Sequence, residues 1–187
     1  MPSPVGHVLG GLAAGWLVAG RSPAAAREPQ AGSSPRVHAL DRDAVLYALL
    51  GAAPDVDLLF AAHSTYTHSI GAVAVTALAA LLWTRGRQVL RAVACAAALA
   101  SHVLLDWLGT DTTPPLGVMA LWPFTHEFYQ SPFFVFMAIS RRWWLPGFYT
   151  QNGLAAVREL VILTPIVALI GAVRARSARS NDFGTGP

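Results

Sequence analysis

Lysine is absent from this chain, and charged residues of either sign are scarce. All 13 basic residues are arginine, and charged residues make up 12% of the 187 positions, about half of what a soluble domain carries. Hydrophobic residues make up 54% of the chain, and its mean hydropathy is +0.47. The scarcity of charge therefore disfavours a soluble globular protein and predicts a protein integral to a lipid bilayer.

Cysteine is nearly absent too, because Cys95 is the only one. A single cysteine excludes an internal disulfide, and its alanine-rich apolar surroundings predict a small core residue. The first apolar stretch lacks a basic region before it, so we expect a retained helix rather than a cleaved signal peptide. The net charge of +3 comes from arginines in loops and in the tail, which suits membrane topology, and no nucleic-acid partner is expected.

Apolar runs separated by polar or turn-rich stretches indicate an all-α fold. We predict a multi-pass transmembrane helical bundle of about five spans. The apolar runs cover residues 5–20, 44–53, 70–83, 89–108 and 153–173. The shorter apolar pieces of residues 116–144, rich in Trp and Tyr, predict a re-entrant or interfacial segment. Residues 1–176 form one expected domain, followed by a disordered tail over 177–187, and residues 21–42 are expected to be a mobile loop.

Arginine positions predict the orientation of the bundle. Arginines gather in residues 21–42, in the turn 85–91 and in the tail 174–179, and such segments tend to stay cytoplasmic. If all three segments lie on the cytoplasmic side, the candidate site residues, which the next paragraph describes, lie at the non-cytoplasmic face. The same topology leaves Arg141, Arg142 and Arg158 on that face.

Histidines and aspartates recur at one end of four predicted segments. His102 and Asp106 are four residues apart, so on a helix they share one face. We predict six metal ligands: His7, Asp55, His63, His68, His102 and Asp106. The alternative for His102 and Asp106 is a buried hydrogen bond that only supports packing. The alternative for His7 is a polar residue at a helix end, and that for His63 is a residue of a surface loop. Ionisable groups at membrane depth favour the ligand interpretation.

Imidazole and carboxylate together are borderline ligands, suited to a divalent metal, with Zn favoured and Mn or Fe as alternatives. Six candidates permit one or two ions. The carboxylates of Asp57 and Asp111 are the predicted catalytic groups, either as general base or as a partner that orients a ligand imidazole. His126 and Glu127 are left outside the predicted ligand set.

Short motifs follow one another in a specific order over residues 1–124. They are Gly-His at 6–7, Pro-Asp-Val-Asp at 54–57, His-x4-His at 63–68, Ser-His-x3-Asp at 101–106 and Leu-Trp-Pro-Phe at 121–124. In these motifs the chain resembles the YdjM-like family of membrane-bound metal-dependent hydrolases. The resemblance implies a hydrolase of a bacterial-type inner membrane. That family usually has Arg after the first His of His-x4-His, where this chain has Ser64.

The order of ligands is also similar, more weakly, to the zinc-dependent phospholipase C and single-strand nuclease group, whose helical core holds zinc ions that hydrolyse phosphodiesters. This similarity implies a ligand set of His7, Asp55, His68, His102 and Asp106. The expected function is hydrolysis of an ester, above all a phosphoester, in an amphiphilic small-molecule substrate that enters from the bilayer. A metal or proton transporter and a non-catalytic membrane scaffold are the alternatives.

Overall fold

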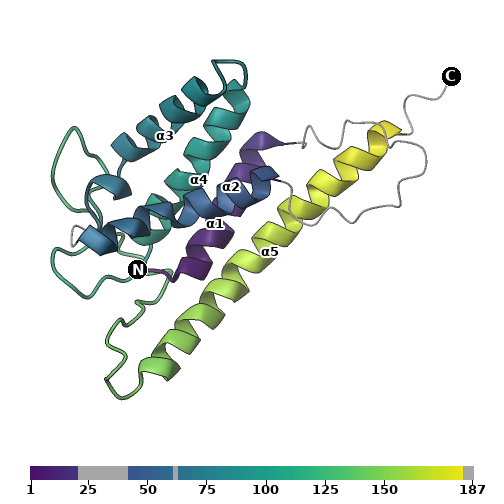
Figure 1. Cartoon of the computed structure of the whole chain (residues 1–187). Helices are drawn as coiled ribbons and strands as arrows, with labels where there is room; N and C mark the ends of the chain where they lie inside the picture. The colour runs from purple at the N-terminus through teal and green to yellow at the C-terminus, as the bar shows by residue number, and fades with distance from the viewer. Residues whose placement is uncertain (21–41, 61–62, 183–187) are drawn as a thin grey trace.

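Five α-helices make up most of the described chain. The computed structural model describes residues 1–20, 42–60 and 63–182 (Figure 1). The helices are α1 (Pro4–Ala19), α2 (Arg42–Ala52), α3 (Ile70–Trp83), α4 (Val89–Trp107) and α5 (Phe148–Asp182), with short 3-10 helices η2 (Ala53–Phe60) and η3 (Tyr66–His68) between α2 and α3. The described residues contain two isolated β-bridges and no strand, so the prediction of an all-α fold is confirmed for them.

Serine side chains fix where two of these helices begin. The Ser3 hydroxyl accepts a hydrogen bond from the backbone N–H of Gly6 at 3.3 Å, and Pro4 occupies the first helical position, which is the usual chemistry of a helix start. Ser69 does the same for α3, because its hydroxyl accepts from the N–H of Ala72 at 3.2 Å. Ser69 directly follows His68, and Ser3 lies four residues before His7, so each cap helps to fix a predicted site residue.

Helix α1 is the centre of the bundle, since it packs against α2, α4 and α5, while α3 packs against α4 (Figure 1). Glycines let α1 and α2 approach closely. A Cβ on Gly51 would lie 2.3 Å from the carbonyl oxygen of His7 and 2.8 Å from Cα of Gly11. Small residues at a crossing allow such contact between backbones. The crossing therefore holds His7 directly beside the end of α2.

Cys95 lies in a buried apolar cluster with Tyr47, Ala94 and Ala98, and it is a free thiol. Its expected role as a small core residue is confirmed. This cluster joins α2 to α4 on the side of the bundle away from the last turn of α4.

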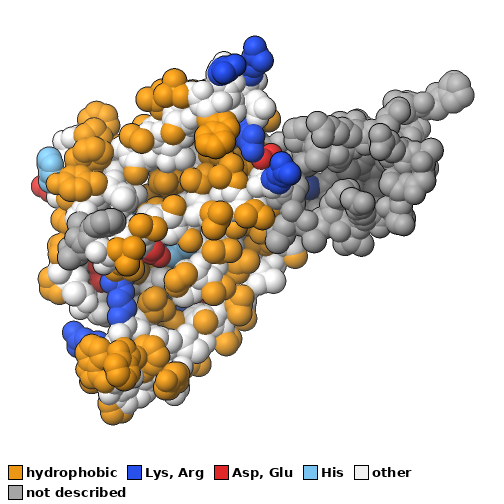
Figure 2. All heavy atoms as spheres, in the orientation of Figure 1, with side chains coloured by type: hydrophobic (Ala, Val, Ile, Leu, Met, Phe, Trp, Pro, Cys, Tyr) orange, Lys and Arg blue, Asp and Glu red, His pale blue; other side chains and the backbone are white. Residues whose placement is uncertain are grey.

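Within the described residues, two helices are long and apolar enough to cross a bilayer. They are α4, with a hydropathy of 1.6, and residues Phe148–Ser177 of α5, with a hydropathy of 2.0. Only 11% of the apolar window in α5 is buried inside the protein, and Figure 2 shows hydrophobic side chains covering much of the visible face. The apolar helices α1 and α3 have 16 and 14 residues, and α2 has 11, whereas a span needs about 20. The bundle of about five spans stays a prediction.

The segment between α4 and α5 contains no helix. It is extended, with one antiparallel bridge between Val118 and Tyr129 and one parallel bridge between Gly109 and Phe136. Carbonyls of this segment accept hydrogen bonds from the first turn of α3, including Ala120 from Ile70 at 2.9 Å. It therefore covers the end of the bundle where α3 begins, and its re-entrant or interfacial placement stays a prediction.

Helix α5 differs from its prediction at both ends. It begins at Phe148 rather than at residue 153 and continues through Pro165 to Asp182. The first part of the tail predicted as disordered, 177–187, is thus helical, because Ala and Arg are good helix formers. Residues 183–187 and the predicted loop at 21–41 lie outside the described residues.

Candidate metal centre

Five of the six predicted ligands converge at one end of the bundle. His7 comes from α1, Asp55 from η2, His68 from η3, and His102 and Asp106 from the last turns of α4. The Asp106 Oδ2 lies 3.2 Å from Nε2 of His68 and 3.1 Å from Nε2 of His102, and its Oδ1 lies 3.3 Å from Nε2 of His7. All four of these side chains are buried. Helices that alternate in direction thus deliver their polar ends to one point.

Asp55 forms the more open side of this cluster. Its Oδ1 lies 3.8 Å from Nε2 of His68 and 3.7 Å from Nε2 of His102, and its side chain is 21% exposed. Burial raises the pKa of Asp55, but attraction to the imidazoles of His68, His102 and His7 outweighs burial and lowers it. Asp55 is therefore the most exposed of the five residues at the centre.

The outer ring nitrogens of two histidines are both occupied. Nδ1 of His102 lies 2.7 Å from the carbonyl oxygen of Gly51 and donates its proton there; Pro54, three residues after Gly51, has no N–H to compete for that oxygen. Nδ1 of His68 lies 3.1 Å from Oδ2 of Asp57. With the protons on Nδ1, both Nε2 atoms present lone pairs to the cluster, as is usual for ligating histidines.

Those two Nε2 atoms, of His68 and His102, lie 2.9 Å apart. Two nitrogen lone pairs at this distance repel each other unless a positive charge lies between them. Burial alone lowers the pKa of His68, but the attraction of the carboxylates of Asp106, Asp55 and Asp57 outweighs burial and raises the pKa to about 11. The carboxylates thus favour a cation at this point, which a metal ion supplies when it displaces a proton.

The deepest polar atoms of the cluster form no hydrogen bond. Both ring nitrogens of His7 and both oxygens of Asp106 are buried without a hydrogen-bond partner, although buried polar atoms are nearly always paired. Ligand atoms about 2.0–2.2 Å from a tetrahedral ion lie about 3.3–3.6 Å from one another, and the distances between candidate ligand atoms here, 2.9–3.8 Å, bracket that range. The residues present therefore fit a divalent metal, and the mixed nitrogen and oxygen donors suit Zn, Mn or Fe.

Asp57 lies on the far side of His68 from the centre and accepts two hydrogen bonds, from Nδ1 of His63 at 2.9 Å and from the hydroxyl of Thr67 at 2.6 Å. Nδ1 of His68 lies 3.1 Å from Oδ2 of Asp57 and 3.0 Å from the Thr67 hydroxyl. Burial raises the pKa of Asp57, but these bonds outweigh it and lower the pKa to about 2. Of its two predicted roles, this arrangement favours orienting His68 over accepting a proton.

His63 is the predicted ligand that does not reach the five-residue centre. Its Nδ1 contacts Asp57, and its Nε2 accepts from Nη2 of Arg141 at 2.9 Å. Ligand atoms of His63, Asp55 and His68 nevertheless lie within 4.8 Å of one another, so these three residues could hold a second ion. His126 and Glu127 are exposed, consistent with their omission from the predicted set.

Asp111, the other predicted catalytic carboxylate, lies in the loop after α4. Its oxygens accept from the backbone N–H groups of Thr113 and Gly117, each at 3.1 Å. It lines a polar cavity of about 470 Å³ together with His63 and Arg141. Asp111 thus reaches the cavity beside the centre rather than the centre itself.

Glu159 lies at the same end of the bundle as the candidate metal centre, and the sequence analysis did not predict a role for it. It is completely buried in α5 and accepts from the backbone N–H of Ser3 at 2.7 Å and from the Ser3 hydroxyl. Gly6 makes room for it, because a Cβ there would lie 2.7 Å from Oε2 of Glu159. The sequence feature that could have pointed to Glu159 is a carboxylate inside an apolar run. The hydrogen bonds of Glu159 to Ser3 connect α5 to the turn of α1 that carries His7.

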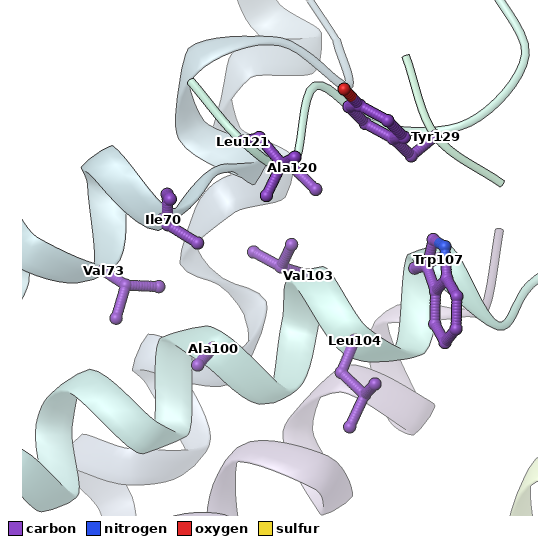
Figure 3. Close-up of a pocket in the computed structure, with 9 residues that line it drawn as sticks. All are labelled: Ile70, Val73, Ala100, Val103, Leu104, Trp107, Ala120, Leu121 and Tyr129. Carbon is purple, nitrogen blue, oxygen red and sulfur yellow. The ribbon is translucent and has the colours of Figure 1, made fainter. Parts of the chain in front are cut away.

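A second cavity, of about 380 Å³, is almost wholly apolar. Figure 3 shows its lining side chains, which come from α3, α4 and the segment after α4. Val103 and Trp107 of α4 belong to it, and they neighbour His102 and Asp106 in the chain. The same helix thus presents metal-ligand candidates on one face and an apolar cavity on another.

Comparison with known proteins identifies the family. A family model described as YdjM inner membrane protein matches residues 1–178. The chain belongs to the YdjM family. Membership makes it an inner membrane protein in a lipid bilayer, as its composition predicts. No curated protein and no solved structure gives a significant match to this YdjM-family chain, and the similarity to the zinc-dependent phospholipase C group is not shown by these comparisons.

Proposed function

We propose that this YdjM-family protein is a membrane-bound metal-dependent hydrolase of phosphoester bonds in an amphiphilic small molecule. The observation that supports it is the convergence of buried Nε2 and carboxylate atoms of four residues, His7, His68, His102 and Asp106. The atoms of His7 and Asp106 form no hydrogen bond, and the Nε2 atoms of His68 and His102 lie 2.9 Å apart. Such an arrangement destabilises the fold unless a cation neutralises it. Zn is the favoured ion, with Mn or Fe as alternatives.

The proposed roles follow from where each side chain lies. A divalent metal, when bound, polarises a phosphoryl oxygen and lowers the pKa of water. His102 and His68 are held in the ligating tautomer by Gly51 and Asp57. Asp111 lines the polar cavity, whereas Asp57 contacts His63, Thr67 and His68, so we assign Asp111 as the group that accepts a proton from water. The apolar cavity beside α4 suits the hydrocarbon part of the substrate.

We further propose a multi-pass topology with the site on the non-cytoplasmic side. Arginines at the other end of the bundle support this, because Arg91 in the first turn of α4 pairs with Asp43 and Arg174 donates to the carbonyl of Trp16 near the end of α1. Arg91 lies 11 residues before His102 on α4, and Trp16 lies nine residues after His7 on α1. Arginine-rich ends tend to remain cytoplasmic.

Two alternative functions make different demands on the structure. A metal or proton transporter needs polar groups that continue toward the arginine-rich end, and the described core there consists of Tyr47, Ala94, Cys95 and Ala98. A non-catalytic scaffold has no use for unpaired buried atoms at Asp106. These observations favour the hydrolase.

The test is turnover of a generic phosphodiester, bis(p-nitrophenyl) phosphate, by the full chain in detergent micelles. We expect bound metal, turnover lost on chelation and turnover restored by Zn, Mn or Fe. His102→Ala should lose both metal and turnover. Asp111→Asn should keep the metal and lose about 100-fold or more in kcat, the usual contribution of a general base.

The matched control is Glu127→Gln, an exposed carboxylate on the same extended segment, which should behave like the unaltered protein. Stoichiometric metal without chelator-sensitive turnover, on this probe and on a panel of phospholipids, would contradict the hydrolase. Metal transport into proteoliposomes would then favour the transporter, and neither turnover nor transport would favour the scaffold.

A further inference from the structure

Two arginines just before α5 line the polar cavity beside the metal centre. Arg141 and Arg142 contribute guanidinium groups to it, and Asp111 contributes the only carboxylate among the lining residues. That carboxylate already accepts two backbone hydrogen bonds. Neither arginine forms an ion pair with a carboxylate of the described residues. The cavity therefore has an excess of positive charge that no described acidic side chain balances.

The backbone that carries these arginines is firmly held. The side-chain amide of Asn152 accepts from the N–H of Ser140 at 2.7 Å and donates to the Ser140 carbonyl at 2.9 Å. Gln151 donates to the carbonyl of Ala138 at 3.1 Å. Both amides belong to the first turns of α5. The guanidinium of Arg141 is thus presented from a fixed base, as binding sites require.

A short chain of contacts joins Arg141 to the centre. Its Nη2 donates to Nε2 of His63, and His63 donates from Nδ1 to Asp57. Oδ2 of Asp57 lies 3.1 Å from Nδ1 of the ligand candidate His68. One bond to His63 uses one of five guanidinium donors, and a guanidinium fork matches two oxygens of a phosphate. An anion in the cavity would therefore lie beside the metal centre.

We propose that this cavity binds the phosphate group of the substrate and that Arg141 and Arg142 determine specificity for it. That the bound phosphate belongs to a substrate rests on the proposed function, whereas the binding of a phosphate in this cavity does not depend on that function. The exposed Trp143 and Trp144 follow the arginines directly, 70% and 63% exposed. Exposed tryptophans are typical of the membrane–water interface, where the head of an amphiphilic phosphate ester lies.

The test measures binding rather than turnover, using hexylphosphonate, whose carbon–phosphorus bond resists hydrolysis. The full chain, as purified in a non-ionic detergent, is titrated by calorimetry with hexylphosphonate, with uncharged hexanol and with inorganic phosphate. Because one charge-assisted bond contributes about 1.5–3 kcal/mol, Arg141→Gln and Arg142→Gln should each weaken hexylphosphonate about 10-fold or more. Arg141→Lys keeps the positive charge but not the forked guanidinium geometry, so it should weaken hexylphosphonate binding less than Arg141→Gln does.

Arg87→Gln is the matched control, since Arg87 is an exposed arginine in the turn between α3 and α4, and it should leave binding unchanged. Equal binding by the Arg141→Gln variant and the unaltered protein, or equal loss in Arg87→Gln, would overturn the inference. So would hexanol binding as tightly as hexylphosphonate. Inorganic phosphate binding as tightly as hexylphosphonate would support the anion site and assign its ligand to soluble phosphates. Arginine-dependent binding without phosphodiester turnover would refute the proposed function alone.

Discussion

Replacing Gly51 by alanine tests whether the close crossing of α1 and α2 builds the metal centre. The added Cβ would lie 2.3 Å from the carbonyl oxygen of His7, about 1 Å inside an ordinary contact, and its neighbours are backbone atoms that cannot rotate away. Overpacking of this kind destabilises by about 1–3 kcal/mol, and we expect the upper end. For a chain of this length, about 3 kcal/mol lowers the thermal midpoint by about 6–12 °C.

The same substitution should weaken the metal site. Gly51 supplies the carbonyl that orients His102 and touches the backbone of His7, so separating the helices moves two ligand candidates at once. Misplaced partners of metal ligands weaken metal binding by about 10–100-fold. Thermal unfolding in micelles and metal content by mass spectrometry measure the two effects.

Gly153→Ala is the control for this prediction. A Cβ on Gly153, in α5, would meet nothing within 4 Å, and alanine favours a helix over glycine by about 1 kcal/mol. This variant should be unchanged or slightly more stable and should keep its metal. If Gly51→Ala matched Gly153→Ala in midpoint and metal content, the tight crossing would not be what positions the centre.

Three further substitutions probe separate parts of the site. Asp57→Asn should keep the fold and weaken metal binding about 10-fold or more, because it disturbs the partner that orients His68; competition with a chelator measures this, and unchanged affinity would contradict the orienting role. Glu159→Gln should lower the free energy of unfolding by about 2 kcal/mol through loss of charge-assisted bonds to Ser3, measured by denaturant titration in micelles. His126→Ala should leave metal content unchanged, and loss of metal would mean that the ligand set is incomplete.

Local signals were enough to predict the helices that begin at a clear cap or turn. Helix α3 spans the predicted residues 70–83, because Ser69 caps it and Thr84 ends it. Helix α4 ends one residue before its predicted end. The gathering of His7, His68 and Asp106 followed from the alternation of helix direction. Such inferences need only short-range chemistry and the direction of each helix.

The rest depended on geometry that sequence patterns do not carry. The tight turns of η2 send Asp55 toward the centre and Asp57 to the far side of His68. The bond between Glu159 and Ser3 joins residues 156 positions apart. Arg141 reaches His63 from an extended segment whose backbone partners lie elsewhere in the chain. Tertiary contacts of this range have no local signature.

The ligand candidates are spread from His7, in the first helix, to Asp106, at the end of the fourth. During synthesis, a coordination shell of this kind cannot close until α4 has emerged and packed, so ion capture would mark the completion of the bundle. An ion that binds only the assembled form stabilises it by mass action, by about 2.7 kcal/mol at a hundred times its Kd. Metal supply in the compartment that the site faces would then govern how much of this protein survives in the membrane.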